Sequence, residues 1–308
     1  MGAGWVAGVT RAEAMAAGRA GPDTARRLAT APSLSDALRE LAGTCYRRGL
    51  DVTAGAADAQ RAVSEALVWQ LRVLAGWQPR PGTVAVRLLA SAFEIENTHH
   101  HLRALSGAPR RAPYRLGALS TAWPRLSRTT SPAGLRAVLA TSAWGDPGAE
   151  SPAAVVTGMR LSAAARTAAN VPQAARWAAG RAALLVAREV RLTGLRLTGP
   201  AGRRAASLLG PAALRAPSFT GFRDRLAPPA RWALADVERP EDLWRAEARW
   251  WHAVEGEALG MLRRARLDAS PVVAAAAVLG VDAWRVRAGL ECAAQGGRAL
   301  EAFDELVG

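Results

Sequence analysis

One helical pattern recurs three times along this chain and limits what the chain can fold into. The clearest copy spans residues 92–107, where two carboxylates and an amide precede basic residues and a closing glycine. Cations in the last turn and a glycine just beyond it are typical of a helix C-terminus. Shorter copies span residues 188–199 and 281–290. We therefore interpret the chain as three copies of one helical unit.

The first acidic residue of each copy gives the period of this repeat. These residues are Glu94, Glu189 and Asp282, spaced 95 and then 93 residues apart. Solenoid repeats are shorter, at roughly 20 to 50 residues. The long period instead predicts three small helical domains arranged about a pseudo-axis, with units at 1–112, 113–206 and 207–308.

The residue types predict an all-α protein. Alanine, leucine, arginine and glutamate dominate, whereas runs of β-branched or aromatic residues are scarce. No alternating strand pattern persists beyond a few residues. Half of the 308 residues are hydrophobic, which is enough for a large core and excludes a disordered chain.

Apolar spacing and capping signals place individual helices. We expect long helices at about 56–74, 153–168, 172–197 and 241–266, and a shorter one opening after the N-cap Ser33. The segment from Ser131 to Trp144 resembles the segment from Ser33 to Tyr46. In both, a capped helix is followed by a threonine and an aromatic residue, which are Thr44 with Tyr46 and Thr141 with Trp144.

The charge balance indicates anionic partners without naming them. The chain has 40 basic and 26 acidic residues and a net charge of +14, and every basic residue is arginine. This excess predicts attraction to phosphates, anionic lipid headgroups or acidic protein surfaces. The arginines are scattered along the predicted helices instead of forming a run, which disfavours nucleic-acid binding.

Cysteine usage and apolar runs bear on the compartment. Cys45 and Cys292 lie far apart and form no CxxC motif, so we expect two free thiols in a reducing cytosol. The N-terminus lacks the apolar core of a signal peptide. The longest apolar run, residues 271–281, is about half the length of a membrane span. These features predict a soluble protein that can still sit on a membrane complex.

Sequence motifs for catalysis and cofactor binding are missing. The chain has no P-loop, no Asp-rich metal motif, no HExxH and no GxSxG. The only histidine cluster is His99-His100-His101, and adjacent helical residues point about 100° apart, so the three rings cannot converge on one ion. We expect no metal, no cofactor and no enzymatic activity.

The acidic residues of the repeat could be paired catalytic acids or structural charges. Glu94 and Glu96 fall on different helix faces, and an active site needs one set of acids rather than three. We therefore expect structural charges that pair between helices with Arg103, Arg188 or Arg285.

The tryptophan cluster near residue 250 also has two interpretations. Trp244, Trp250 and Trp251 are interleaved with arginines and could stack on a ligand. Core packing or contact between lobes is the preferred interpretation.

The order of these motifs resembles one family of central-stalk rotor adaptors, the C and d components of the archaeal-type (A-type) and vacuolar-type (V-type) rotary ATPases. Members carry a capped helix ending in Thr-x-Tyr, which here is Thr44-Cys45-Tyr46. Their Asp-Ile-x-Asn-Leu-Lys helix corresponds to residues 94–99, followed by Leu-Arg-Ala at 102–104 and by Gly107. In that family a Leu-x-x-Gly-x-Leu motif opens the next repeat unit, and it corresponds here to residues 115–119 and again to residues 208–212. The third copy ends in a helix like 282–290.

This resemblance implies a structural coupling protein. Such proteins form an all-helical funnel of three similar lobes that holds the foot of the rotor shaft and rests on the membrane ring. The implied partners are the rotor shaft proteins (D/F-type) and the proteolipid ring, at the cytoplasmic face of the membrane. Candidate interface or structural residues, by position in the repeat, are Glu94, Glu96, Asn97, His99, Arg103, Glu189 and Asp282.

Two alternatives to the coupling role follow from composition. A basic helical protein that binds nucleic acid or anionic surfaces is consistent with the net charge alone. An all-α enzyme of the isoprenoid type is disfavoured because the Asp-rich motif is missing.

Overall fold

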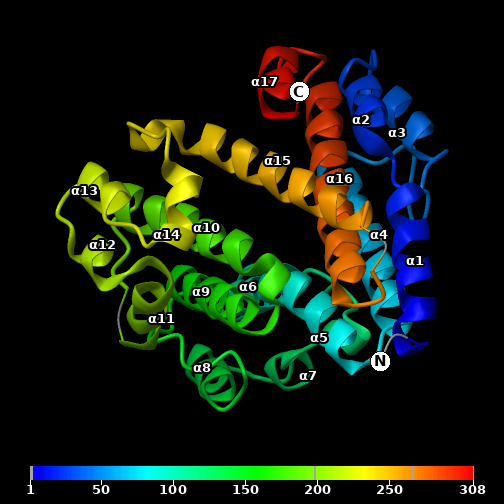
Figure 1. Ribbon diagram of the computed structural model, residues 1–308. Coiled ribbons are helices and arrows are strands. Elements are labelled where there is room, and N and C mark those ends of the chain that lie inside the picture. The colour runs from blue at the N-terminus through cyan, green and yellow to red at the C-terminus, as the bar shows by residue number, and fades with distance from the viewer. Residues whose placement is uncertain (1–2, 198, 265, 308) are drawn as a thin grey trace. The chain divides into compact units, whose positions relative to one another are not determined.

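The computed structural model describes residues 3–197, 199–264 and 266–307, and within these ranges it contains helices and no strands (Figure 1). The all-α prediction is therefore confirmed. The chain separates into two compact units, one formed by residues 1–86 and 251–308 and the other by residues 87–250. The three repeat units predicted from sequence do not coincide with these two units, and their boundaries stay a prediction.

The first compact unit combines both ends of the chain. Its helices, in order, are α1 (Val6–Ala17), α2 (Gly21–Ala29), α3 (Leu34–Leu41), α4 (Ala56–Gly76), most of α5 (Arg80–Leu89), the end of α15 (Leu243–Leu262), α16 (Ala269–Ala294) and α17 (Leu300–Val307). Helix α16 packs against α1, α2, α3, α4 and α17, as Figure 1 shows for α1, α2 and α4. The unit is thus built around its last long helix.

Burial explains why α16 is so apolar. It is the one described helix long and apolar enough to cross a bilayer by length and composition, but 78% of its most apolar stretch is buried inside the protein. A central core helix needs apolar residues on every face. Valine and alanine side chains such as Val272, Ala274, Val278 and Val281 provide them.

The second compact unit is formed by the middle of the chain. Its helices are α6 (Ser91–Leu105), α7 (Trp123–Leu126), α8 (Pro132–Ala140), α9 (Pro152–Asn170), α10 (Ala175–Val186), α11 (Gly199–Leu209), α12 (Pro211–Arg215), α13 (Phe219–Asp224) and α14 (Pro228–Arg231), with the start of α15. Helix α9 packs against α6, α10 and α11. One apolar cluster forms around Leu126, Leu135 and Trp144, and another around Leu209, Phe222 and Leu234.

Several predicted helix ends are confirmed in detail. Ser33 and Ser131 cap α3 and α8 by accepting the backbone N–H of Asp36 and Gly134. Gly107 follows α6 with a φ of 90°, and the next residue donates its N–H to the carbonyl of Arg103 at 2.9 Å. This backbone geometry is the Schellman motif, which a glycine adopts most readily.

Other predicted boundaries were wrong by a turn or more. The helix of the clearest copy begins at Ser91, because the chain is interrupted at Ala90 after α5 ends at Leu89. The helix predicted at 172–197 ends at Val186 and continues as a π-helical turn, Ala187–Leu192.

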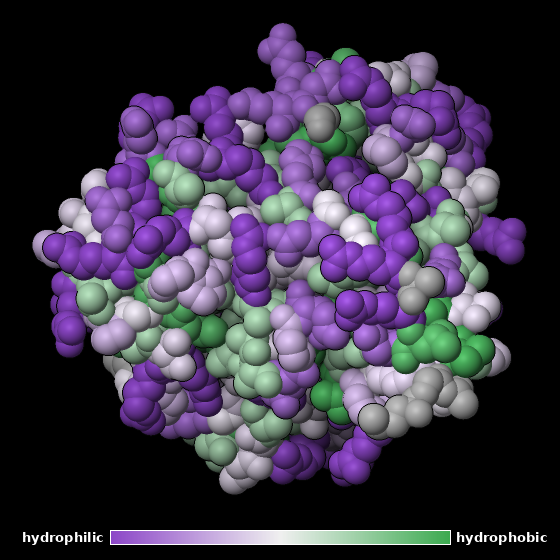
Figure 2. All heavy atoms as spheres, viewed as in Figure 1, coloured by the Kyte–Doolittle hydropathy of each residue, from purple (hydrophilic) through white to green (hydrophobic). Residues whose placement is uncertain are grey.

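Surface polarity matches the composition. On the face viewed in Figure 2, hydrophilic residues are spread across the surface, and hydrophobic ones form small areas between them. The free-thiol prediction is also confirmed, because neither Cys45 nor Cys292 forms a disulfide.

We predict that Gly289→Ala destabilises the first unit. A Cβ at this position of α16 would lie 2.6 Å from the carbonyl oxygen of Ala25 and 3.2 Å from the Cβ of Leu28. Relieving that overlap requires α2 to move, at a cost of about 1–3 kcal/mol. Urea denaturation followed by circular dichroism measures this loss.

Gly280→Ala in the same helix is the matched control. No atom lies within 4 Å of a Cβ built there. Alanine has the higher helix propensity, so the control should be neutral or more stable by up to about 1 kcal/mol. Equal losses for both variants would contradict close α2–α16 packing as the cause.

Candidate functional site

A buried carboxylate on α16 connects three segments of the first unit. Asp282 is 2% exposed. Its oxygens accept hydrogen bonds from the backbone N–H of Ala20 at 3.1 Å, from that of Gly21 at 2.7 Å and from the Tyr46 hydroxyl at 2.8 Å. The two amides lie at the start of α2, where helical N–H groups have no partner within the helix. We call this arrangement the first carboxylate clasp.

The second unit contains the same arrangement built from other residues. Glu94 on α6 is 1% exposed. It accepts the backbone N–H of Thr121 at 2.5 Å, that of Ala122 at 2.6 Å and the indole N–H of Trp144 at 3.0 Å. The two amides immediately precede α7. This second carboxylate clasp therefore has the same donor types as the first: two successive amides and one aromatic side chain.

The aromatic donors are positioned in the same way in both clasps. Tyr46 and Trp144 each lie 13 residues after the serine that caps the preceding helix. The N–H of Tyr46 donates to the Thr44 hydroxyl at 3.2 Å, and the N–H of Trp144 donates to the Ser142 hydroxyl at 3.1 Å. The residue that corresponds to Thr44 is thus Ser142, and the sequence-based match to Thr141 was wrong by one position.

Burial next to Asp282 affects two neighbouring groups. The pKa of the Tyr46 hydroxyl is raised well above its usual value, first by burial and then by the Asp282 charge. Burial, followed by the same charge, also raises the pKa of the Cys45 thiol. Both groups are therefore protonated near neutral pH, as the hydrogen bond from Tyr46 requires.

The acidic residue of the second copy, Glu189, does not form a clasp. Glu189 lies in the π-helical turn after α10, and its nearest described cation is Arg160, at 3.9 Å. Arg191, in the same turn, donates instead to the carbonyls of Ala213 and Leu214 at the end of α12. A cation here contacts a helix C-terminus, whereas the clasps place an anion at the start of a helix.

The predicted pairing with arginines was wrong for Glu94 and Asp282. Glu94 and Asp282 bind backbone N–H groups and aromatic N–H or O–H groups, because their burial next to free helix N-termini supplies donors without a second charge. Arg285 pairs with Glu255 at 2.5 Å, and Arg188 pairs with Glu247 at 2.5 Å.

The remaining candidates on α6 hold the chain that follows it. The side-chain oxygen of Asn97 accepts the backbone N–H of Tyr114 at 2.7 Å, and its amide nitrogen donates to the Tyr114 carbonyl at 3.0 Å. The side chain thus satisfies both backbone groups of Tyr114. Glu96 accepts the Tyr114 hydroxyl at 3.2 Å. His99 is half-buried, and burial, followed by the nearby His100 and Arg103, lowers its pKa. Arg103 is exposed in the last turn.

Sequence reasoning missed most of the partners that these residues hold. Tyr114, Thr121 and Ala122 carry no motif of their own, and only the aromatic residue after each capped helix gave a usable signal.

In the histidine cluster, the ring of His101 lies 3.0 Å from the carbonyl of Thr129. No group of three or more metal-ligand side chains comes together among the described residues.

The tryptophans near residue 250 pack against the protein. The indole N–H of Trp250 donates to the carbonyl of Trp177 at 3.0 Å, and Trp250 packs on the apolar cluster of the second unit. Trp251 stacks on Trp284 with ring centroids 5.5 Å apart. These contacts agree with the packing interpretation.

Comparison with protein-family models and with curated proteins finds no match to this chain.

Proposed function

We propose that this protein is a non-catalytic central-stalk component of a bacterial V/A-type rotary ATPase. In that role it couples the rotor shaft to the membrane proteolipid ring during ATP-linked proton or sodium transport. The observation that carries the proposal is the carboxylate clasp, built twice from different sequence units. It supports a true internal repeat, which the resemblance to the C and d rotor adaptors implies.

The direction of the clasps supports three lobes about a pseudo-axis. Glu94, in the first sequence unit, holds the start of the second unit through Thr121 and Ala122. Asp282, in the third unit, holds the start of the first through Ala20 and Gly21. Each clasp thus joins one sequence unit to the start of another, which supports the internal repeat.

A structural role also follows from how the recurring acids of the repeat are used. A general acid or base must face a substrate. Glu94 and Asp282 are buried, and each receives three hydrogen bonds from the protein. These carboxylates stabilise the fold and do not face solvent, which supports a protein without chemistry of its own.

The net charge of +14 fits this location. A basic protein at the cytoplasmic face of the membrane can meet acidic surface on the shaft and anionic lipid headgroups on the ring side. The proposed partners are therefore the shaft proteins and the proteolipid ring, with this protein bound peripherally.

Affinity purification from native membranes tests the proposal. A tagged copy expressed at its natural level should recover the shaft proteins and the proteolipid, identified by mass spectrometry. A tagged cytosolic protein of similar charge is the control for ionic capture. Recovery of neither partner, in cells whose ATPase assembles normally, would contradict the proposal.

A further inference from the structure

An arginine-lined pocket lies in the first unit, next to the first clasp. Its volume is about 730 Å³. Five arginines line it, contributed by α1, α2 and the segments that follow α1 and α3, and no lining residue is acidic. They are Arg11, Arg19, Arg27, Arg47 and Arg48. We call this the arginine pocket.

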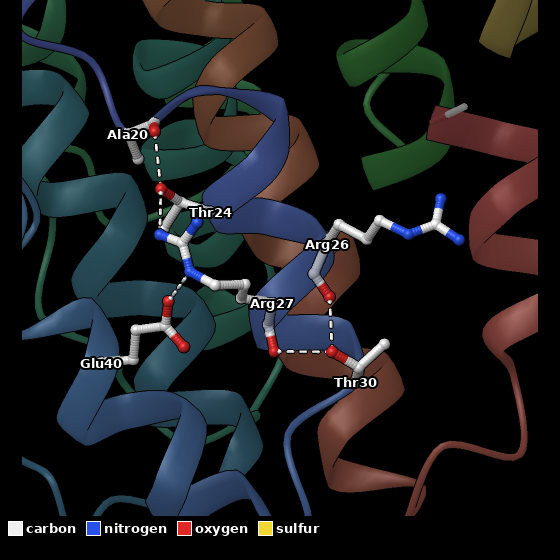
Figure 3. A network of polar contacts seen from close by, with 6 residues as sticks. All are labelled: Ala20, Thr24, Arg26, Arg27, Thr30 and Glu40. Carbon is white, nitrogen blue, oxygen red and sulfur yellow. Dashed lines mark hydrogen bonds and ion pairs between the residues drawn. The ribbon is translucent and has the colours of Figure 1, made fainter.

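Most of these arginines have no carboxylate to neutralise them. Arg27 pairs with Glu40 at 2.5 Å, and Figure 3 shows its side chain extending from α2 to Glu40 on α3. Among the described residues, no ion pair is formed by Arg19, Arg47 or Arg48. Asp282 lies nearby but is not a lining residue, and its charge is already shared among three donors. The pocket therefore carries an uncompensated positive potential.

Buried donors in the pocket wall also lack acceptors. The Nε of Arg19 is buried without a hydrogen-bond partner. Gln70 is 4% exposed; its side chain interacts with the Cys45 thiol, and its amide oxygen and nitrogen have no other partner within hydrogen-bond geometry. Buried polar groups are nearly always paired, so such unpaired groups call for an explanation. A bound anion that draws these side chains into the pocket would supply acceptors for the Arg19 Nε and the Gln70 amide nitrogen.

The guanidinium groups at the rim are already positioned. Arg48 lies over the ring of Trp69, 4.9 Å from its centroid, and Arg11 lies over Trp77 at 5.6 Å. Stacking on an aromatic face restricts an arginine while leaving its N–H groups free to donate. The planar fork of arginine matches phosphate oxygens, and ligand pockets are typically about 300–1,000 Å³ in volume.

We propose that the arginine pocket binds a phosphate-bearing ligand, with Arg19, Arg47 and Arg48 as its principal donors. The ligand is either a free phosphate ester or the headgroup of an anionic phospholipid, which share this chemistry. The inference is independent of the rotor proposal.

Titration calorimetry with inorganic pyrophosphate on the full chain tests the free-ligand source. The wild type should bind, and Arg47→Gln/Arg48→Gln should weaken binding by at least about tenfold, because two charge-assisted contacts are lost. The control is Arg110→Gln/Arg111→Gln, which removes the same charge from exposed residues outside the pocket. It should bind within about twofold of the wild type, since distant surface charges are screened.

Co-sedimentation with phosphatidylcholine vesicles, with and without phosphatidylglycerol, tests the lipid source. Binding only to the anionic vesicles, lost in Arg47→Gln/Arg48→Gln and kept in the control, would assign the ligand as a headgroup. Thermal melting of Arg47→Gln/Arg48→Gln should fall only slightly, because both residues are exposed and only the stacking of Arg48 on Trp69 is lost, and the control should melt like the wild type. The proposal is overturned if neither ligand binds, or if the control weakens binding as much as the pocket variant.

Discussion

Asp282→Ala should destabilise the protein by about 3–5 kcal/mol, because two partly buried amides and one buried hydroxyl lose their acceptor at roughly 1–3 kcal/mol each. The donors are the N–H groups of Ala20 and Gly21 and the hydroxyl of Tyr46. Water cannot easily replace the carboxylate, because Asp282 is 2% exposed. Urea denaturation followed by circular dichroism measures the loss.

Asp282→Asn separates hydrogen bonding from packing. Asparagine has nearly the same volume, but it presents an NH2 group where an oxygen accepted a hydrogen bond. This variant should therefore also be destabilised, although no cavity is made. If Asp282→Asn had the same free energy of unfolding as the wild type, neither the charge nor the second acceptor oxygen of Asp282 would contribute to stability.

Glu94→Ala should cost about the same, roughly 3–5 kcal/mol, because its carboxylate also satisfies three donors, two of them buried. The effect should be local to the second unit. Hydrogen exchange should show lost amide protection at Thr121, Ala122 and Trp144, while protection at Tyr46 in the first unit is retained.

Glu189→Ala is the matched control for both clasps. Glu189 occupies the same acidic position in the second copy of the repeat but is partly exposed, and its nearest described cation is 3.9 Å away. Exposed ion pairs contribute little, so this variant should lose less than about 1 kcal/mol. If Glu189→Ala lost as much stability as Glu94→Ala, the hydrogen bonds of the clasp would not explain the loss caused by Glu94→Ala.

Local features of the fold could be predicted from the sequence. The serine caps Ser33 and Ser131 marked the starts of two helices, and Gly107 marked the end of a third. These signals could be recognised because caps and closing glycines act on backbone groups only a few residues away. The break between α5 and α6 at Ala90 could not be predicted. Its apolar pattern is continuous, and alanine gives no sign of a helix boundary.

The site was predicted in its residues but not in its contacts. Glu94 and Asp282 stood out because they recur with a similar period. Their partners are mainly backbone amides, which every residue except proline carries, so the sequence holds no signal for which amides they bind. An arginine was therefore predicted as partner, because opposite charge is the only pairing that residue type alone suggests.

The long reach of the first clasp sets an order for folding. Asp282 binds Ala20, Gly21 and Tyr46 across 262, 261 and 236 residues of chain. The second clasp joins Glu94 to Trp144 across only 50 residues. During synthesis the second unit can thus close before α16 is made, whereas α2 and Tyr46 wait until α16 has left the ribosome. Helix α2 and the segment around Tyr46 should therefore become resistant to proteases later than the second unit.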